Sequence, residues 1–64
     1  MSAAAREIAG LRFAVACVGV PMSIGAIRRA RSVLRTCPDG WERVDLAALI
    51  GLAEYLRTHE QVAA

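Results

Sequence analysis

Apolar residues recur at helical spacing in the first stretch of the chain. They follow one another at intervals of three or four positions, which places them on one face of a helix. These residues are Ala4, Ile8, Leu11, Val15 and Val18. The alanines that precede them favour a helix as well, because alanine has the highest helix propensity. The pattern predicts a helix over residues 3–17.

Part of this stretch also fits a β-strand. Phe13, Val15 and Cys17 occupy every second position of an apolar run at residues 11–20. A short apolar run is compatible with both structures, so periodicity alone does not decide between them. The alternative to a first helix is therefore a short strand at residues 11–20, followed by two helices.

The second stretch begins after Gly19 and Pro21, which are typical of a turn. Ser23 is a candidate N-cap, since its hydroxyl can accept a hydrogen bond from a free amide of the first helical turn. We predict a helix over residues 24–35 with one apolar and one basic side. The apolar side contains Ile27, Ala30, Val33, Leu34 and Cys37, and the opposite side contains Arg28, Arg31 and Arg35, with Arg29 at its edge.

A third helix is predicted over residues 42–59, after a turn formed by Pro38, Asp39 and Gly40. Asp39 and Asp45 are its two candidate N-caps. Its apolar residues cover about 200° of arc, more than the roughly 100° that one packed neighbour requires. These residues are Leu46, Leu49, Ile50, Leu52, Ala53 and Leu56. Trp41, just before this helix, is expected to anchor the core.

These elements predict a single all-α domain of three helices over residues 1–64. A chain of this length buries only about 60% of the surface that its unfolded form exposes, and it is marginally stable alone. Its composition is nevertheless 56% hydrophobic. We therefore expect the core to be completed by homodimerisation. The expected interface consists of Leu46, Leu49, Leu52 and Leu56.

Charge is distributed unevenly along the chain. Five arginines and no acid lie between Ile8 and Pro38, whereas two arginines and five acids follow from Asp39 onward. There is no lysine, and the net charge is only +2. The basic helix has three interpretations: a nucleic-acid surface, a surface that meets the acidic third segment of another copy, or a solvated helix face.

A local resemblance favours the first interpretation. The stretch GVPMSI at residues 19–24, followed by IRRA at residues 27–30, resembles the turn and recognition helix of helix-turn-helix regulators. Three positions depart from that pattern, which has an alanine and two apolar residues where this chain has Val15, Gly25 and Arg28.

The resemblance implies a small DNA-binding protein of transcription regulation. The residues near bases would be Met22, Ser23, Ala26 and Arg29, and phosphates would be contacted by Arg28, Arg31 and Arg35. The alternative function is a non-enzymatic protein-interaction or assembly subunit that docks through its third helix.

The chain offers little that is typical of catalysis or metal binding. Cys17, Cys37 and His59 are scattered, whereas a zinc site uses about four ligands. We interpret both cysteines as reduced, buried side chains. Glu54 and Glu60 are six residues apart and do not share a helical face. We expect no enzyme activity, metal, cofactor or small-molecule substrate.

The uncharged run from Phe13 to Ile27 is a candidate membrane segment. It is shorter than the roughly 20 residues that cross a bilayer, and Pro21 interrupts it. We therefore expect a cytoplasmic protein that does not insert into membranes.

Overall fold

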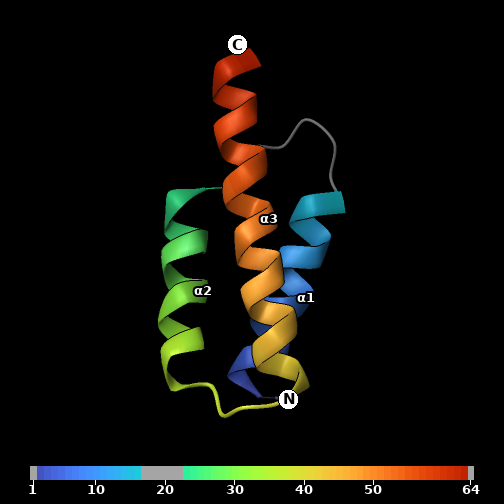
Figure 1. The fold of residues 1–64 in the computed structure, drawn as a ribbon, viewed down its shortest axis with the longest axis vertical. Helices are drawn as coiled ribbons and strands as arrows, with labels where there is room; N and C mark the ends of the chain where they lie inside the picture. The colour runs from blue at the N-terminus through green and yellow to red at the C-terminus, as the bar shows by residue number, and fades with distance from the viewer. Residues whose placement is uncertain (1, 17–22, 64) are drawn as a thin grey trace.

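Three helices make up the described part of the chain. The structure, a computed structural model, describes residues 2–16 and 23–63, with side chains up to residue 59. The helices are α1 (Ala3–Ala16), α2 (Ile24–Thr36) and α3 (Trp41–Ala63). They run up, down and up in an elongated bundle, and the C-terminal part of α3 extends beyond the other two helices (Figure 1). The predicted all-α class is confirmed.

The helix at the start of the chain is also confirmed as far as residue 16. Residues 11–16 belong to α1, so the alternative strand is wrong for that part of the run. Predictions for Cys17, Val18, Met22 and the turn at residues 19–21 lie outside the described residues.

Helix α2 begins as the sequence predicts. The Ser23 hydroxyl oxygen accepts a hydrogen bond from the backbone N–H of Ala26 at 3.1 Å, and Ser23 itself has extended backbone angles. This side chain satisfies one of the amides that have no partner within the helix. The N-cap prediction for Ser23 is confirmed.

The residue that precedes helix α3 as its N-cap is a glycine, and neither candidate aspartate has this position. Its first residue is Trp41, so Gly40 occupies the N-cap position, with a φ of 148° that favours glycine. The Gly40 carbonyl accepts the N–H of Val44 at 3.2 Å. Asp39 precedes this position and Asp45 lies one turn inside the helix. Both cap predictions are therefore wrong, because the chain needs a left-handed residue immediately before Trp41.

The core is formed by the predicted inward faces of all three helices. Its buried residues are Ala4, Ile8, Leu11, Ile27, Ala30, Leu46, Ile50 and Ala53. Half-buried side chains, among them Val15, Val33 and Leu49, pack against them. Three of the eight buried residues are alanines. The described part of the core is therefore thin, since each alanine buries much less apolar surface than a leucine or isoleucine.

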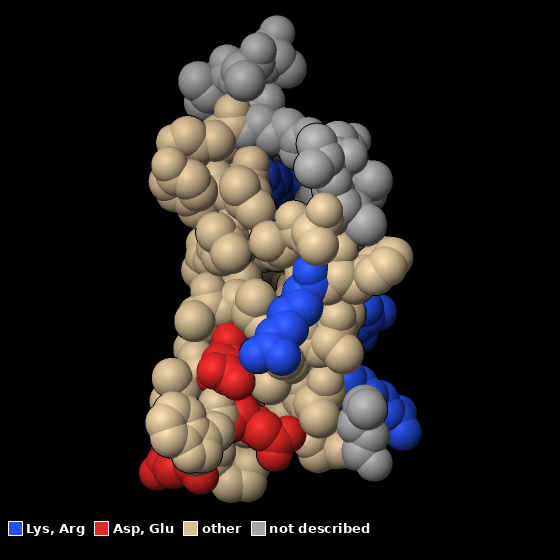
Figure 2. All heavy atoms as spheres, turned by 90° about the vertical axis from the view of Figure 1, so that its right-hand side faces the viewer, with Lys and Arg blue, Asp and Glu red and all other residues tan. Residues whose placement is uncertain are grey.

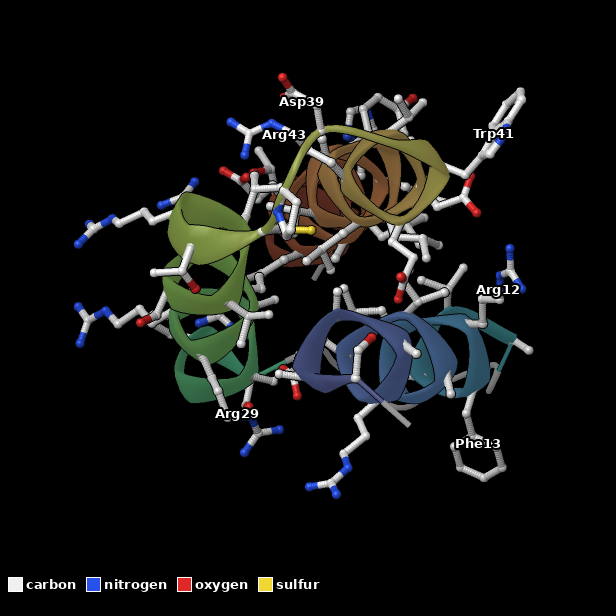
Figure 3. The ribbon with its side chains drawn as sticks, turned by 90° about the horizontal axis from the view of Figure 1, so that it is seen from below. Arg12, Phe13, Arg29, Asp39, Trp41 and Arg43 are labelled. Carbon is white, nitrogen blue, oxygen red and sulfur yellow. The ribbon has the colours of Figure 1, made fainter. Side chains whose placement is uncertain are left out.

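Trp41 does not belong to this core. Its side chain is 85% exposed and points away from the bundle, as Phe13 does on α1 (Figure 3). The prediction of a core anchor is wrong because the exposure of Trp41 depends on its position around the helix and not on the size of its side chain. At about 100° per residue, position 41 lies on the side of α3 opposite Ile50.

Candidate interaction surfaces

Helix α3 carries a second apolar face on the side away from the core. We define the outer face of α3 as Trp41, Val44, Ala48, Leu52 and Tyr55, all of which are exposed. Successive members are three or four residues apart, so they fall within about 80° of arc. This arc lies opposite the buried side of the helix. Leu56 borders it and is 39% exposed.

Charged residues of α3 lie elsewhere on the helix. Among the described side chains of α3, no Asp, Glu or Arg projects within the arc of the outer face. A surface helix normally places its charged residues opposite the core. Here that side is apolar, and large contiguous apolar surfaces mark sites of association. The outer face is therefore the main candidate for binding another protein.

The structure divides the predicted oligomer interface into two groups. Leu46 is 0% exposed and Leu49 is half-buried against the core, so both are less accessible to a partner than surface residues are. Leu52 and Leu56 are 42% and 39% exposed. Sequence reasoning missed Trp41, Val44 and Tyr55, although their spacing of three and four residues was a readable signal.

Among the described residues, an ion pair crosses each of the three helix contacts. Arg29 Nε lies 3.2 Å from Glu7 Oε1 and joins α2 to α1. Arg31 on α2 contacts Glu54 on α3. The α1–α3 contact has Arg12 Nη2 at 3.5 Å from Asp45 Oδ2, and basic and acidic side chains meet on this side of the molecule (Figure 2).

These pairs change the interpretation of the charge asymmetry. The basic second helix does meet the acidic third helix, but Arg31 and Glu54 make this contact within one chain. Their side chains are 52% and 41% exposed, and such exposed pairs contribute at most about 1 kcal/mol. This pair therefore adds little to the stability of the fold.

The predicted nucleic-acid residues do not form one free surface. Ser23 caps α2, and Ala26 is half-buried against the core. Arg29 and Arg31 are paired as described above. Arg28 and Arg35 are exposed and form no ion pair with any residue that the structure describes.

The relation between α1 and α2 also bears on the helix-turn-helix resemblance. The two helices of that motif cross at about 90–120° after a short turn. Here α1 and α2 run in opposite directions along the bundle (Figure 1). The resemblance thus extends to the residue pattern but not to the arrangement of these two helices.

Arg43 is a structural side chain that the sequence analysis did not single out. Its Nη1 donates hydrogen bonds to the carbonyl oxygens of Leu34 at 3.1 Å and Cys37 at 2.8 Å. Its Nε lies 3.7 Å from Asp39 Oδ1. The last carbonyls of a helix have no partner within it. Arg43 therefore closes the end of α2 from the first turn of α3, as Figure 3 shows from below.

The remaining reactive groups are dispersed. The His59 ring stacks on Tyr55 with centroids 3.9 Å apart, and Cys37 is a half-buried free thiol. The described side chains contain no group of three or more His, Cys, Asp or Glu residues placed to hold a metal ion. Within the described chain, no helix combines the length and apolarity that crossing a membrane requires.

Comparison of the chain with protein-family models, with curated proteins and with solved structures gave no match. The surfaces described above are therefore the basis for assigning a function. Of these, the outer face of α3 is the most distinctive.

Proposed function

We propose that this chain is a non-enzymatic assembly module that pairs with a second copy of itself through the outer face of α3. The observation that carries the proposal is the apolar character of α3 on two opposite sides. One side forms the core of the single chain, and the other exposes Trp41, Val44, Leu52 and Tyr55. Burial of such side chains is worth about 1.5–3 kcal/mol each when it is complete.

The thin core favours a second copy as the partner. Among the residues that the structure describes, eight are buried in the core and three of these are alanines, which gives little apolar burial to offset the conformational entropy of folding. Small domains commonly meet this shortfall by oligomerisation. A dimer would add the outer face of α3 from both copies to the buried surface.

The outer face is also self-complementary about Ala48. Trp41 and Tyr55 lie seven residues on either side of Ala48, and Val44 and Leu52 lie four residues on either side. In a two-fold dimer with antiparallel α3 helices, Trp41 would therefore face Tyr55 of the second copy. The small side chain of Ala48 at the centre would allow the two helices to approach closely.

The experiment compares two variants that each add one acid to α3. Leu52→Glu places a charge in the outer face, whereas Ala47→Glu places it at an exposed position outside that face. We expect Leu52→Glu to be monomeric and Ala47→Glu to remain dimeric in sedimentation equilibrium, with equal helix content by circular dichroism. Equal effects of the two substitutions on the mass would contradict the proposal.

DNA binding through α2 is a second candidate function. It is favoured by Arg28 and Arg35, which share the outward side of α2 and have no described ion-pair partner. Phosphate contacts would make the affinity for duplex DNA fall steeply as salt is raised. We expect Arg28→Gln with Arg35→Gln to weaken binding more than Arg29→Gln, which changes a paired arginine. Lack of binding at low salt would exclude this function.

A cytoplasmic location is part of the same proposal. The free thiol of Cys37 fits a reducing compartment, where cysteines stay unpaired. Rapid alkylation of this thiol in intact cells, without prior reduction, is the expected result. Alkylation only after reduction would place the protein in an oxidising compartment.

A further inference from the structure

The arc of the outer face of α3 continues for one more turn to His59. This residue follows Tyr55 by four positions, so it projects in the same direction from the helix. Its side chain is exposed, and its ring stacks on that of Tyr55 with centroids 3.9 Å apart. The ring atom Nδ1 also lies 3.1 Å from the Tyr55 carbonyl oxygen. A side chain that can gain a positive charge is therefore held at one end of an apolar surface.

A hollow of about 250 Å³ lies at the other end of α3, where the chain enters this helix from α2. Its lining, residues 37–42, contains two acids and no basic residue. Of the two acids, Asp39 pairs with Arg43. Glu42 is exposed, accepts a hydrogen bond from the Ser2 hydroxyl and forms no ion pair with any residue that the structure describes. Glu42 is therefore the carboxylate that remains available to a cation.

The antiparallel pairing of two α3 helices would bring these two features together. His59 lies eleven residues after Ala48, and Cys37 lies eleven residues before it. Pairing about Ala48 would therefore carry the turn of α3 at His59 past the start of α3 in the second copy, to the segment that lines the hollow. The two-fold axis repeats this contact, so the dimer contains it twice.

We propose that His59 of each copy docks into the hollow of the other, and that its protonation strengthens the dimer through Glu42. The inference rests on the proposed pairing through the outer face of α3. Histidine gains a proton near pH 6.5, and an imidazolium beside a carboxylate makes a charge-assisted hydrogen bond. Pro38 and Trp41 line the same hollow and offer apolar surface to the ring.

The neighbouring charges favour the protonated ring. In the second copy, Asp39 adds a negative charge, which it shares with Arg43. The Arg43 guanidinium also donates to two carbonyls at the end of α2. On the helix of His59 itself, Arg57 projects about 160° away around the axis. Two carboxylates and one guanidinium therefore face the docked ring, which leaves an excess of negative charge.

The test is the dissociation constant of the dimer, measured by sedimentation equilibrium at pH 8.0 and at pH 5.5, where carboxylates stay ionised. We expect the constant of the unmodified chain to be about three- to tenfold lower at pH 5.5, the effect of two exposed ion pairs per dimer. Glu42→Gln should remove this response. The matched control is Glu54→Gln, which removes an acid of α3 outside the hollow and should keep the response.

Two substitutions of the histidine test the role of its charge. His59→Lys carries a positive charge at both pH values, so it should dimerise tightly at both. His59→Gln carries none, so it should dimerise weakly at both. The substituted residues are exposed, and equal helix content by circular dichroism checks that each variant folds.

Failure of this inference can be distinguished from failure of the proposed function. The docking of His59 is overturned by a dimer that is no tighter at pH 5.5, by a response that survives in Glu42→Gln or is lost equally in Glu54→Gln, or by equal affinities of His59→Lys and His59→Gln. Each of these results leaves the pairing through α3 intact. A chain that is monomeric at both pH values overturns both proposals.

Discussion

At the scale of single residues, Arg43 is the polar side chain with the clearest structural role. It donates two hydrogen bonds to carbonyls at the end of α2 from a partly buried position. We predict that Arg43→Gln lowers the free energy of unfolding by about 1–3 kcal/mol, because two partly buried carbonyls lose a charged donor. Urea denaturation followed by circular dichroism measures this change.

Arg35→Gln is the matched control for this prediction. Arg35 is exposed, and surface substitutions of this kind change the free energy of unfolding by less than about 0.5 kcal/mol. If both variants unfold at the same urea concentration, Arg43 does not stabilise the end of α2.

Alanine substitutions at Gly40 and Gly10 should change the stability of the fold in opposite directions. Neither position has an atom within 4 Å of an added Cβ, so packing does not decide the result. Gly40→Ala should destabilise the fold by about 1 kcal/mol or more, because a φ of 148° strains an alanine. Gly10→Ala, inside α1, should stabilise it by about 0.5–1 kcal/mol. Thermal unfolding checks both, and a stabilising Gly40→Ala would contradict the described start of α3.

The roles of single residues could be predicted from the sequence where they depend on contacts between near neighbours in the chain. The Ser23 cap could be predicted because its hydrogen bond reaches only three residues along the chain. The Arg43 contact spans nine residues to Leu34 and depends on how α2 and α3 are placed relative to each other. Trp41 was misassigned because its size suggests burial, whereas its exposure depends on the phase of the helix that follows Gly40.

At the scale of elements, the two apolar sides of α3 should respond differently to truncation. Leu46→Ala creates a cavity in the core and should lower the free energy of unfolding by about 2–5 kcal/mol. Leu52→Ala removes a side chain that is 42% exposed in the single chain, so it should mainly weaken association. Urea titrations at several protein concentrations separate the two effects. A large loss for Leu52→Ala that is independent of concentration would place Leu52 in the monomer core.

The proposed antiparallel pairing of α3 predicts a pattern of disulfide cross-links. The two native cysteines are first replaced by serine (Cys17→Ser and Cys37→Ser). Two single-cysteine variants of that chain, Val44→Cys and Leu52→Cys, should then cross-link to each other when they are mixed and oxidised. Each variant alone should remain mostly uncross-linked, because antiparallel pairing separates identical positions away from Ala48. Efficient self-linking of the Val44→Cys variant, seen on a non-reducing gel, would instead indicate parallel helices.

Helix positions were predicted well from periodicity and from the turn residues that interrupt it. The expected range 24–35 differs by one residue at one end from Ile24–Thr36, and the expected range 3–17 agrees with Ala3–Ala16 as far as the structure describes this stretch. Helix α3 continues past residue 59 to Ala63, since no glycine or proline interrupts residues 57–63. Its apolar arc was predicted to be broader than one packed neighbour requires, and in the structure Leu46 and Ile50 of that arc are buried whereas Leu52 is exposed.

At the scale of the whole molecule, the fold brings together charges that are far apart in the sequence. Glu7 and Arg29 are 22 residues apart, and Arg31 and Glu54 are 23 residues apart, yet both pairs are in contact. Sequence alone shows the excess of arginine but not which acids neutralise it. A hollow between α2 and α3, lined in part by Arg28 and Arg31 of α2 and Arg57 of α3, likewise appears only when the two helices lie side by side.

Pairing of two copies through the outer face of α3 is tested most directly by the mass of the unmodified chain, measured by sedimentation equilibrium from micromolar to millimolar concentration. We expect a mass near twice 6.8 kDa that falls toward 6.8 kDa on dilution. A mass of 6.8 kDa over the whole concentration range would contradict it.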